Sequence, residues 1–142
     1  MSETIKIKYL PESPELEQID KGGCVDLYNY EDVTLQAGEF KLINLGIAME
    51  LPEGYDAIIL PRSSTFKRYH ILLTNSVGYI DNSYAGDTDY WLAGVYATEP
   101  TFIPKGTRCF QFKLVPCQPK LTFNKVNSLT KKVRNGFGST GV

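Results

Sequence analysis

The amino-acid sequence predicts an all-β fold, a compact sandwich or barrel with one small helix. Apolar residues recur with a period of two in the hydrophobic segments, and Pro and Gly recur between those segments. The length of 142 residues suits one domain that can bury a core. No repeat or linker is visible before the Gly-rich C-terminal end, so a single β domain is expected.

The alternation is clearest in two N-terminal segments. In residues 4–9, Ile5, Ile7 and Tyr9 share one face of a strand, and lysines occupy the other. Residues 41–51 are predicted to form one half-buried strand, with an apolar face made by Ile43, Leu45, Ile47, Met49 and Leu51.

Two further strands and the helix follow from local signals. Pro52 to Gly54 predict a turn that leads into a strand over residues 55–60. In residues 107–115 the aromatic face contains Phe110 and Phe112, which directs Cys109 and Gln111 the other way. A short helix is expected after Pro61, within residues 63–70.

Composition excludes several classes of protein. Fifteen basic and sixteen acidic residues, without blocks of like charge, argue against binding to nucleic acid or to an anionic membrane. No apolar segment has the length of a signal peptide or a membrane span, which favours a cytoplasmic protein. Cys24, Cys109 and Cys117 are odd in number and lack CxxC spacing, which favours reduced, buried thiols.

Polar residues interrupt the strand pattern at several places. Asp26 points away from the face of Val25 and Leu27, and both Asp26 and Gln111 could simply be solvated strand positions. Ser63 or Ser64 can cap the short helix, whose N-terminus would then attract an anion beside Arg62, although an ordinary cap explains the same residues.

Residues 74–87 combine strand and turn character. Ile80 suits a hairpin arm, whereas its surroundings are rich in turn-forming residues: Asn75, Gly78, Asn82, Ser83 and Gly86. The segment is therefore a decorated β-hairpin, or a hairpin whose backbone edge recognises a flat base near Asp81 and Tyr84.

The chain ends in a Gly-rich tail, residues 133–142. Glycines surround a few side chains that could bind a ligand: Arg134, Phe137, Ser139 and Thr140. Such a tail is expected to be mobile unless a ligand holds it.

In combination, these segments resemble the trimeric dUTP pyrophosphatases (dUTPases). The sequences GCVDLY, PRSS, GYIDNSYAGD, KGTRCFQF and RNGFGSTG occur in the order and approximate spacing of the family's motifs, from Gly23 to Gly141. The details are most similar to the branch found in Gram-positive bacteria and their phages. The resemblance implies a jelly-roll-like β-barrel over residues 1–132, a flexible lid over residues 133–142, and a homotrimer with composite active sites.

The resemblance also implies an activity. Family members hydrolyse dUTP to dUMP and pyrophosphate through attack of water on the α-phosphorus, which limits uracil incorporation into DNA and supplies dUMP. Asp81 resembles the residue that orients and deprotonates the water, and Gln111 the residue that helps to hold it. Asp26 resembles the carboxylate that engages Mg²⁺ through bound water.

Substrate-binding roles follow in the same way. Arg62, Ser63 and the backbone at Ser64 resemble a phosphate-binding turn. Asn75 resembles the residue that fixes the hairpin, whose main chain, including Gly78 and Ile80, would pair with uracil. Tyr84 would lie against the deoxyribose, where a 2′-hydroxyl would collide with its ring. The tail would contribute phosphate contacts and an aromatic lid, through Arg134, Phe137, Gly138, Ser139 and Thr140.

The sequence departs from the family pattern at three places. Ser64 and Asn135 stand where Gly is usual, and the final motif is short. Tyr90 and Trp91 are alternative candidates for the aromatic that covers the base, although Trp91 is better explained by core or interface packing.

Two other functions remain as alternatives. The dCTP deaminases share the fold, but they need a Glu at the position of Trp91. A non-catalytic regulator that binds a nucleotide or a protein would not need Asp26, Asp81 and Gln111 together.

Overall fold

The structure, a computed structural model, describes residues 2–136 and contains eleven strands and one short helix in that range. The strands are β1 (Lys6–Tyr9), β2 (Val25–Leu27), β3 (Val33–Leu35), β4 (Phe40–Asn44), β5 (Ile47–Glu50), β6 (Tyr55–Pro61), β7 (Ile71–Leu73), β8 (Gly78–Ile80), β9 (Leu92–Ala97), β10 (Thr101–Ile103) and β11 (Phe110–Pro116). The helix, α1, is Thr65–Tyr69, as expected after Pro61. The all-β prediction with one small helix is therefore confirmed.

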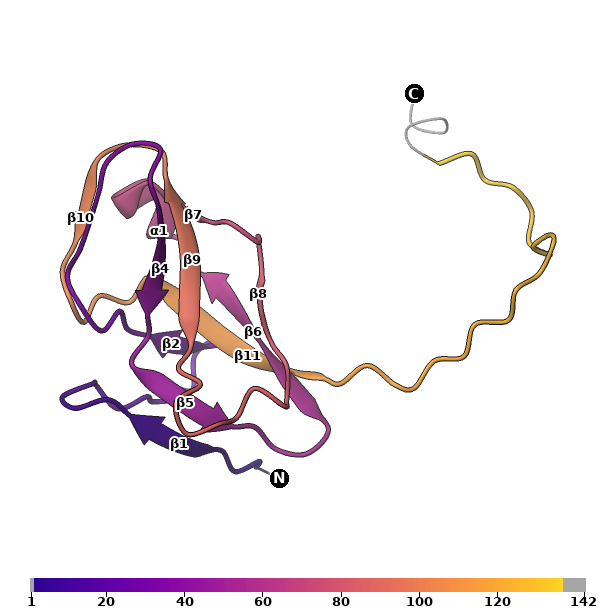
Figure 1. The fold of residues 1–142 in the computed structure, drawn as a ribbon, viewed down its shortest axis with the longest axis horizontal. Helices are drawn as coiled ribbons and strands as arrows, with labels where there is room; N and C mark the ends of the chain where they lie inside the picture. Colours follow the sequence, from indigo (N-terminus) through magenta and orange to yellow (C-terminus); the bar gives the residue numbers. More distant parts are fainter. Residues whose placement is uncertain (1, 137–142) are drawn as a thin grey trace.

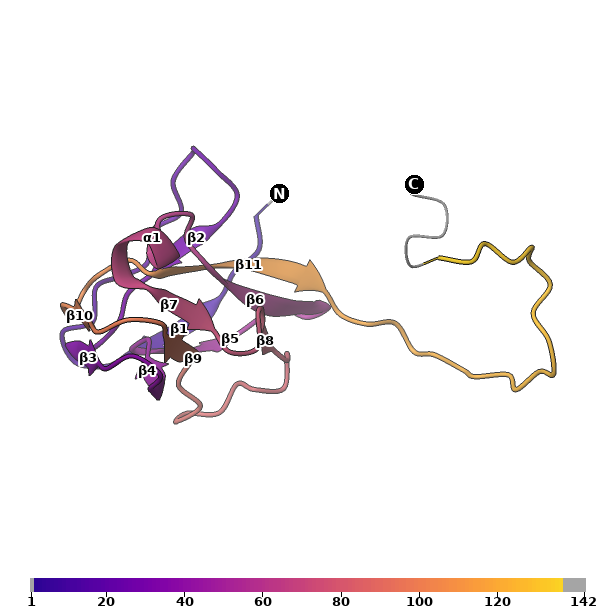
Figure 2. The same ribbon diagram turned by 90° about the horizontal axis from the view of Figure 1, so that it is seen from above.

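The strands form four small antiparallel sheets arranged as a jelly-roll-like barrel (Figures 1 and 2). A four-stranded sheet has the order β2-β11-β6-β8, and a three-stranded sheet has the order β4-β9-β7. Two further pairs, β1-β5 and β10-β3, complete the barrel. The longest pairing joins β11 to β6 from Phe110–Pro61 to Pro116–Tyr55, so these two strands form the backbone of the larger sheet.

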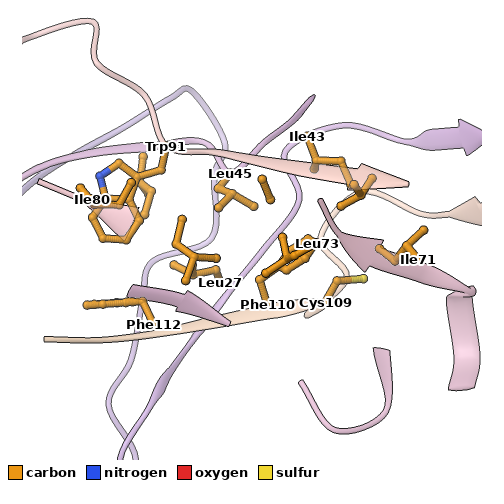
Figure 3. Close-up of a cluster of buried hydrophobic side chains, with 14 of the residues drawn as sticks. Leu27, Ile43, Leu45, Ile71, Leu73, Ile80, Trp91, Cys109, Phe110 and Phe112 are labelled. Carbon is orange, nitrogen blue, oxygen red and sulfur yellow. The ribbon is translucent and has the colours of Figure 1, made fainter. Parts of the chain in front are cut away.

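Apolar side chains from all these sheets fill the interior (Figure 3). Trp91 is fully buried and packs edge-on against Phe112, with 5.3 Å between the ring centroids. Leu27 and Phe110 lie beside this aromatic pair. The interpretation of Trp91 as a packing residue is confirmed, because its ring is part of the core and is not available to cover a ligand.

The predicted faces of the N-terminal strands are correct, but the single strand over residues 41–51 is wrong. The chain breaks between β4 and β5 at Gly46, which has φ of 73° and donates its N–H to Asn44 Oδ1. A Cβ on Gly46 would lie 2.3 Å from Ser13 Oγ, so both the backbone angle and the packing require glycine. The break allows β4 to pair with β9 while β5 pairs with β1.

The hairpin predicted for residues 74–87 is also wrong in its pairing. Strand β7 pairs with β9, whereas β8 pairs with β6 in the other sheet. Strand β7 ends before this segment, and β8 is the one strand within residues 74–87, so the segment connects the two sheets and has no second arm that pairs with β8. Gly78 is not a turn residue but a close-packed one, because a Cβ there would lie 3.0 Å from Ile59 Cβ.

All three cysteines are free thiols, and the expectation that they are buried holds for Cys109 alone. Cys109 is buried directly before β11, although the alternation predicted that it would point away from the core. Cys24 and Cys117 are only half-buried. Burial raises the pKa of the Cys109 thiol to about 12, so it stays protonated at neutral pH.

Strand β11 ends at Pro116, and the following residues lead away from the barrel (Figure 1). Residues 118–136 form no helix or strand, and their side chains are exposed, including Phe123 and Leu129. A lid that begins at residue 133 stays a prediction. Within residues 2–136, no helix is long and apolar enough to cross a membrane.

Candidate active site

The four-stranded sheet brings together residues from three distant segments. Asp26 on β2 lies opposite Gln111 on β11, and Gln111 lies opposite Leu60 on β6. Because side chains alternate along a strand, Asp26 and Gln111 project from the same face, away from the core that holds Leu27 and Phe110. The first and fourth sequence motifs are thus adjacent.

Arg62 connects this pair to the turn before α1. Its Nε lies 3.2 Å from Asp26 Oδ1, and its guanidinium also donates to the Arg108 carbonyl at 3.2 Å. Gln111 Nε2 donates to the Pro61 carbonyl at 3.1 Å, which orients the amide oxygen. Asp26 and Arg62 are both partly exposed, so a ligand can still reach them.

Arg108 is a further residue of the site that the sequence interpretation missed. Its guanidinium lies 3.8 Å from Asp26 Oδ2 and 5.5 Å from the ring centre of Tyr28. Arg108 falls inside the KGTRCFQF motif, three residues before Gln111, and this position within the motif was the available signal. Its position also directs a second positive charge toward Asp26.

These side chains line a cavity of about 340 Å³. Its polar and charged lining consists of Glu17, Lys21, Asp26, Tyr28, Arg62, Ser63, Arg108 and Gln111. Three cationic side chains face two carboxylates there, so the cavity suits an anionic ligand. Local groups supply this positive charge, since the whole chain has a net charge of −1.

The predicted cap of α1 by Ser63 or Ser64 is wrong. Ser64 occupies the N-cap position, but its side chain makes no capping hydrogen bond. The side chain that bonds to the backbone of this turn is that of Thr65. Its Oγ1 accepts the Arg62 N–H at 3.0 Å and donates to the Cys109 carbonyl at 2.5 Å. The turn is therefore tied to β11, and the hydroxyl of Ser63 remains on the exposed surface beside the cavity.

The segment from Asn75 to Asp87 lies at the opposite edge of the sheet. Asn75 and Ser76 form a tight turn in which Ser76 has φ of 60° and the Val77 N–H bonds to the Asn75 carbonyl. After β8, the Tyr84 N–H bonds to the Asp81 carbonyl at 2.9 Å, so the chain turns immediately after Asp81. Asp81 is exposed, and its Oδ1 accepts the Ser83 hydroxyl at 3.1 Å.

Tyr84 is held by a hydrogen bond rather than left free. Its hydroxyl donates to the Tyr90 carbonyl at 2.7 Å, and burial raises the pKa of that phenol, as does the nearby charge of Asp89. Asp89 also accepts the Gly86 N–H at 2.8 Å. The hydrogen bond to the Tyr90 carbonyl limits the direction of the Tyr84 ring, which a steric role would require.

Asp81 does not reach the Asp26 cavity within one chain. Asp26 and Asp81 lie on β2 and just after β8, the two edge strands of the sheet. Along the sheet, Asp26 is level with Leu60 and Ile80 is level with Ala57. Strand spacing and rise place the two carboxylates on the order of 20 Å apart. The structure therefore gathers Asp26, Arg62, Ser63 and Gln111, and separates Asp81, Asn75 and Tyr84 from them.

The tail residues are only partly described. Arg134 is exposed, and Asn135 has φ of 53°, a left-handed angle that Asn tolerates better than most side chains. Phe137, Gly138, Ser139 and Thr140 lie outside the described residues. The predicted substrate contacts of the tail remain predictions.

The site's residues fit Mg²⁺ held through water and phosphate rather than in a protein cage. Residues 2–136 contain no group of three or more His, Cys, Asp or Glu side chains that could hold a metal ion. Asp26 supplies one carboxylate beside a cavity with three cations, and Mg²⁺ commonly binds one or two carboxylates together with substrate phosphates.

Comparison with known proteins agrees with this arrangement. The family model for dUTPase matches residues 19–141. The SPbeta prophage-derived deoxyuridine 5′-triphosphate nucleotidohydrolase of Bacillus subtilis is 46% identical over 138 residues, covering 96% of this chain and 97% of that protein. The corresponding protein of Thermoanaerobacter is 35% identical over 149 residues and is covered in full, as is this chain.

Solved structures show the same fold. The Staphylococcus bacteriophage 80alpha dUTPase with dUPNHPP aligns with a TM-score of 0.80 at 23% identity, over 99% of this chain and 100% of that chain. The dUTPase mutant of S. aureus phage phi11, with a structural Mg(II) ion, has a TM-score of 0.76 at 18% identity and covers 89% of this chain and 98% of that one. With the family model spanning nearly all its strands, the chain belongs to the dUTPase family.

Proposed function

We propose that this protein hydrolyses dUTP to dUMP and pyrophosphate, with Asp81 activating the water that attacks the α-phosphorus. One observation carries the proposal: Asp26, Arg62 and Gln111 line the same cationic cavity. All three lie within the residues that the dUTPase family model matches. The curated relatives above are named as deoxyuridine 5′-triphosphate nucleotidohydrolases, which supports dUTP as the substrate.

The phosphate end of the nucleotide would bind in the Asp26 cavity. Arg62 and Arg108 can donate charge-assisted hydrogen bonds to phosphate oxygens, and Ser63 adds a hydroxyl at the rim. Asp26 would hold Mg²⁺ through bound water. When bound, the metal would neutralise charge that develops on the phosphate oxygens. Gln111 offers both an acceptor and a donor, which suits a residue that holds a water molecule.

The base and sugar would bind along the segment from Asn75 to Asp87. Uracil would pair with main-chain groups near Gly78 and Ile80, and the ring of Tyr84 would exclude a 2′-hydroxyl. A site that pairs its polar groups with one base rejects another, because the wrong base leaves buried groups unpaired. The hydrogen bond from Tyr84 to Tyr90 supports this role, since it limits movement of the ring.

The separation of Asp81 from the cavity supports a composite site. Neither the 75–87 segment nor the Asp26 cavity contains all the groups that the reaction needs. A homotrimer in which one copy supplies Asp81 and another supplies Asp26 and Gln111 would complete the site. Arg134 and the residues from Phe137 to Thr140 would then close over the bound nucleotide.

Product analysis tests the proposal. Purified protein is incubated with Mg²⁺ and dUTP, dCTP, dTTP or UTP, and the products are identified by chromatography. dUMP and pyrophosphate from dUTP alone support the proposal, whereas ammonia from dCTP supports a deaminase and the absence of product supports a binding protein. The structure already disfavours the deaminase, because the position of its required Glu is the fully buried Trp91.

A further inference from the structure

Asp56 is a buried carboxylate outside the cavity described above. Its exposed fraction is 5%, and it is the one buried acidic residue among residues 2–136. Burying a carboxylate is costly unless hydrogen bonds or a cation compensate for the lost water. Asp56 lies on the outer face of β6, so the core does not explain its burial.

Three donors converge on Asp56, and all lie close to Asp81 or to the end of β11. Tyr79 Oη donates to Oδ2 at 2.5 Å, and the backbone N–H of Asn82 donates to Oδ1 at 2.8 Å. The Cys117 thiol contacts the same Oδ1 at 3.3 Å. Among these, the Asn82 contact is the informative one, because Asn82 directly follows Asp81.

The side chain of Asn82 strengthens the same attachment. Its Nδ2 donates to the Pro52 carbonyl at 3.0 Å and to the Tyr55 carbonyl at 2.6 Å. On the other side of Asp81, Ile80 is buried and pairs with Ala57. Asp81 therefore projects from a backbone that is anchored at both neighbouring residues, while its own carboxylate stays exposed.

We propose that Asp56 is a positioning residue for the reaction: it holds the Asn82 backbone and thereby fixes the direction of the Asp81 carboxylate. This inference rests on the proposed function, because it takes Asp81 as the group that activates water. Asp56 itself touches neither the substrate nor the water. Its hydrogen bonds also act on its own ionisation: the Tyr79 hydroxyl, followed by the Asn82 N–H, lowers the pKa of Asp56, so it remains an acceptor at neutral pH.

The test separates positioning from binding and from folding. Asp56→Ala removes both acceptor oxygens and releases the Asn82 N–H. Because a small misplacement of a reacting group can cost up to roughly 100-fold in rate, we expect kcat to fall by about 10- to 100-fold. The Kd for a non-hydrolysable dUTP analogue should change by less than about 3-fold, since remote contacts that bind the nucleotide remain.

Two further variants sharpen the result. Asp56→Asn should restore most of the lost kcat, because an amide can accept from the Asn82 N–H while donating to the Tyr79 oxygen. Asp32→Ala is the matched control: Asp32 also accepts a backbone N–H, that of Lys105 at 2.8 Å, but on another part of the barrel. Its kcat should stay within about 2-fold of wild type.

Asp56→Val keeps the test decisive if Asp56→Ala does not fold, because valine fills more of the buried volume and suits a strand. It also removes both acceptor oxygens of Asp56, and should lower kcat by about 10- to 100-fold without a matching change in the analogue Kd. Near-normal kcat in a folded Asp56→Ala protein, or in Asp56→Val when the former does not fold, overturns the inference. The inference is also overturned if kcat falls in Asp56→Ala and stays equally low in Asp56→Asn.

The wild-type assay distinguishes failure of this inference from failure of the proposed function. If wild type hydrolyses dUTP and Asp81→Asn does not, the function stands whatever Asp56→Ala shows. If wild type does not hydrolyse dUTP, the proposed function fails first and the positioning role fails with it.

Discussion

Asp26 and Gln111 lie directly opposite each other in the antiparallel pair of β2 and β11, although most of the chain separates them in sequence. Arg62 reaches this pair from the end of β6 and contacts Asp26 at 3.2 Å. One sheet thus assembles the phosphate side of the proposed site from three distant segments. Asp81, which we propose activates the water, lies at the other edge of the same sheet and is not part of this group.

Replacing Asp81 tests its role in the chemistry. Asp81→Asn keeps the size of the side chain and removes its basicity, so we expect turnover to fall by roughly 10²- to 10⁴-fold. Binding of a non-hydrolysable dUTP analogue, measured by calorimetry, should stay close to wild type. Turnover near the wild-type rate would remove Asp81 from the mechanism.

Mixing two inactive variants tests the composite site. In a trimer formed from Asp81→Asn and Asp26→Ala chains, a site that takes Asp26 and Asp81 from different subunits can contain both intact residues. Random co-assembly should restore activity at about a quarter of the sites. Sites contained in a single chain would regain none, and sedimentation of an active monomer would also refute the proposal.

The proposed role of the Tyr84 ring in sugar selection can be tested by removing the ring. Tyr84→Ala should narrow the ratio of kcat/KM between dUTP and UTP, because the ring no longer blocks a 2′-hydroxyl. Tyr84→Phe is the control that keeps the ring and loses the hydrogen bond to the Tyr90 carbonyl. An unchanged ratio in Tyr84→Ala would place sugar selection elsewhere.

Truncation tests the tail as a lid. A chain that ends at Lys132 should fold, assemble and bind nucleotide, but hydrolyse it far more slowly, because Arg134 and the residues beyond it no longer close over the phosphates. Hydrogen exchange of the full chain should show protection of residues 134–141 only with a non-hydrolysable dUTP analogue. Equal protection without the analogue, or normal turnover after truncation, contradicts a lid.

The ionisation of the Tyr79 hydroxyl predicts how the free energy of unfolding depends on pH. Its hydrogen bond to Asp56, with burial and the charge of Asp56, raises the pKa of Tyr79 from 10.0 to about 12. A group whose pKa is higher in the folded state stabilises the fold fully below its unfolded pKa, and this contribution is lost as pH rises from about 10 to about 12. The difference in free energy of unfolding between wild type and Tyr79→Phe, from urea denaturation, should therefore shrink over that interval. A constant difference from about pH 8 to pH 12 would contradict the assignment.

The sequence by itself determined the local features of this protein. The alternation places Ile5, Ile7 and Tyr9 on one face of a strand, and it places Asp26 and Leu27 on different faces of another. This pattern depends only on neighbouring residues in a strand. The helix after Pro61 and the turn before Tyr55 follow from similar short-range signals. The ordered motifs were enough to indicate the family, because each lies within a few consecutive residues.

The tertiary structure decided which strands pair and therefore which residues meet. Periodicity cannot show that β7 and β8 belong to different sheets, or that Gly46 divides residues 41–51, because pairing depends on contacts between distant segments. The same reason hides the hydrogen bond between Asp56 and the Asn82 N–H, since an acidic residue on an outer face gives no local sign of its partner. The separation of Asp81 from Asp26 follows from the sheet order β2-β11-β6-β8, which places them at opposite edges of the sheet. At the usual strand spacing, the two carboxylates of one chain are too far apart to meet.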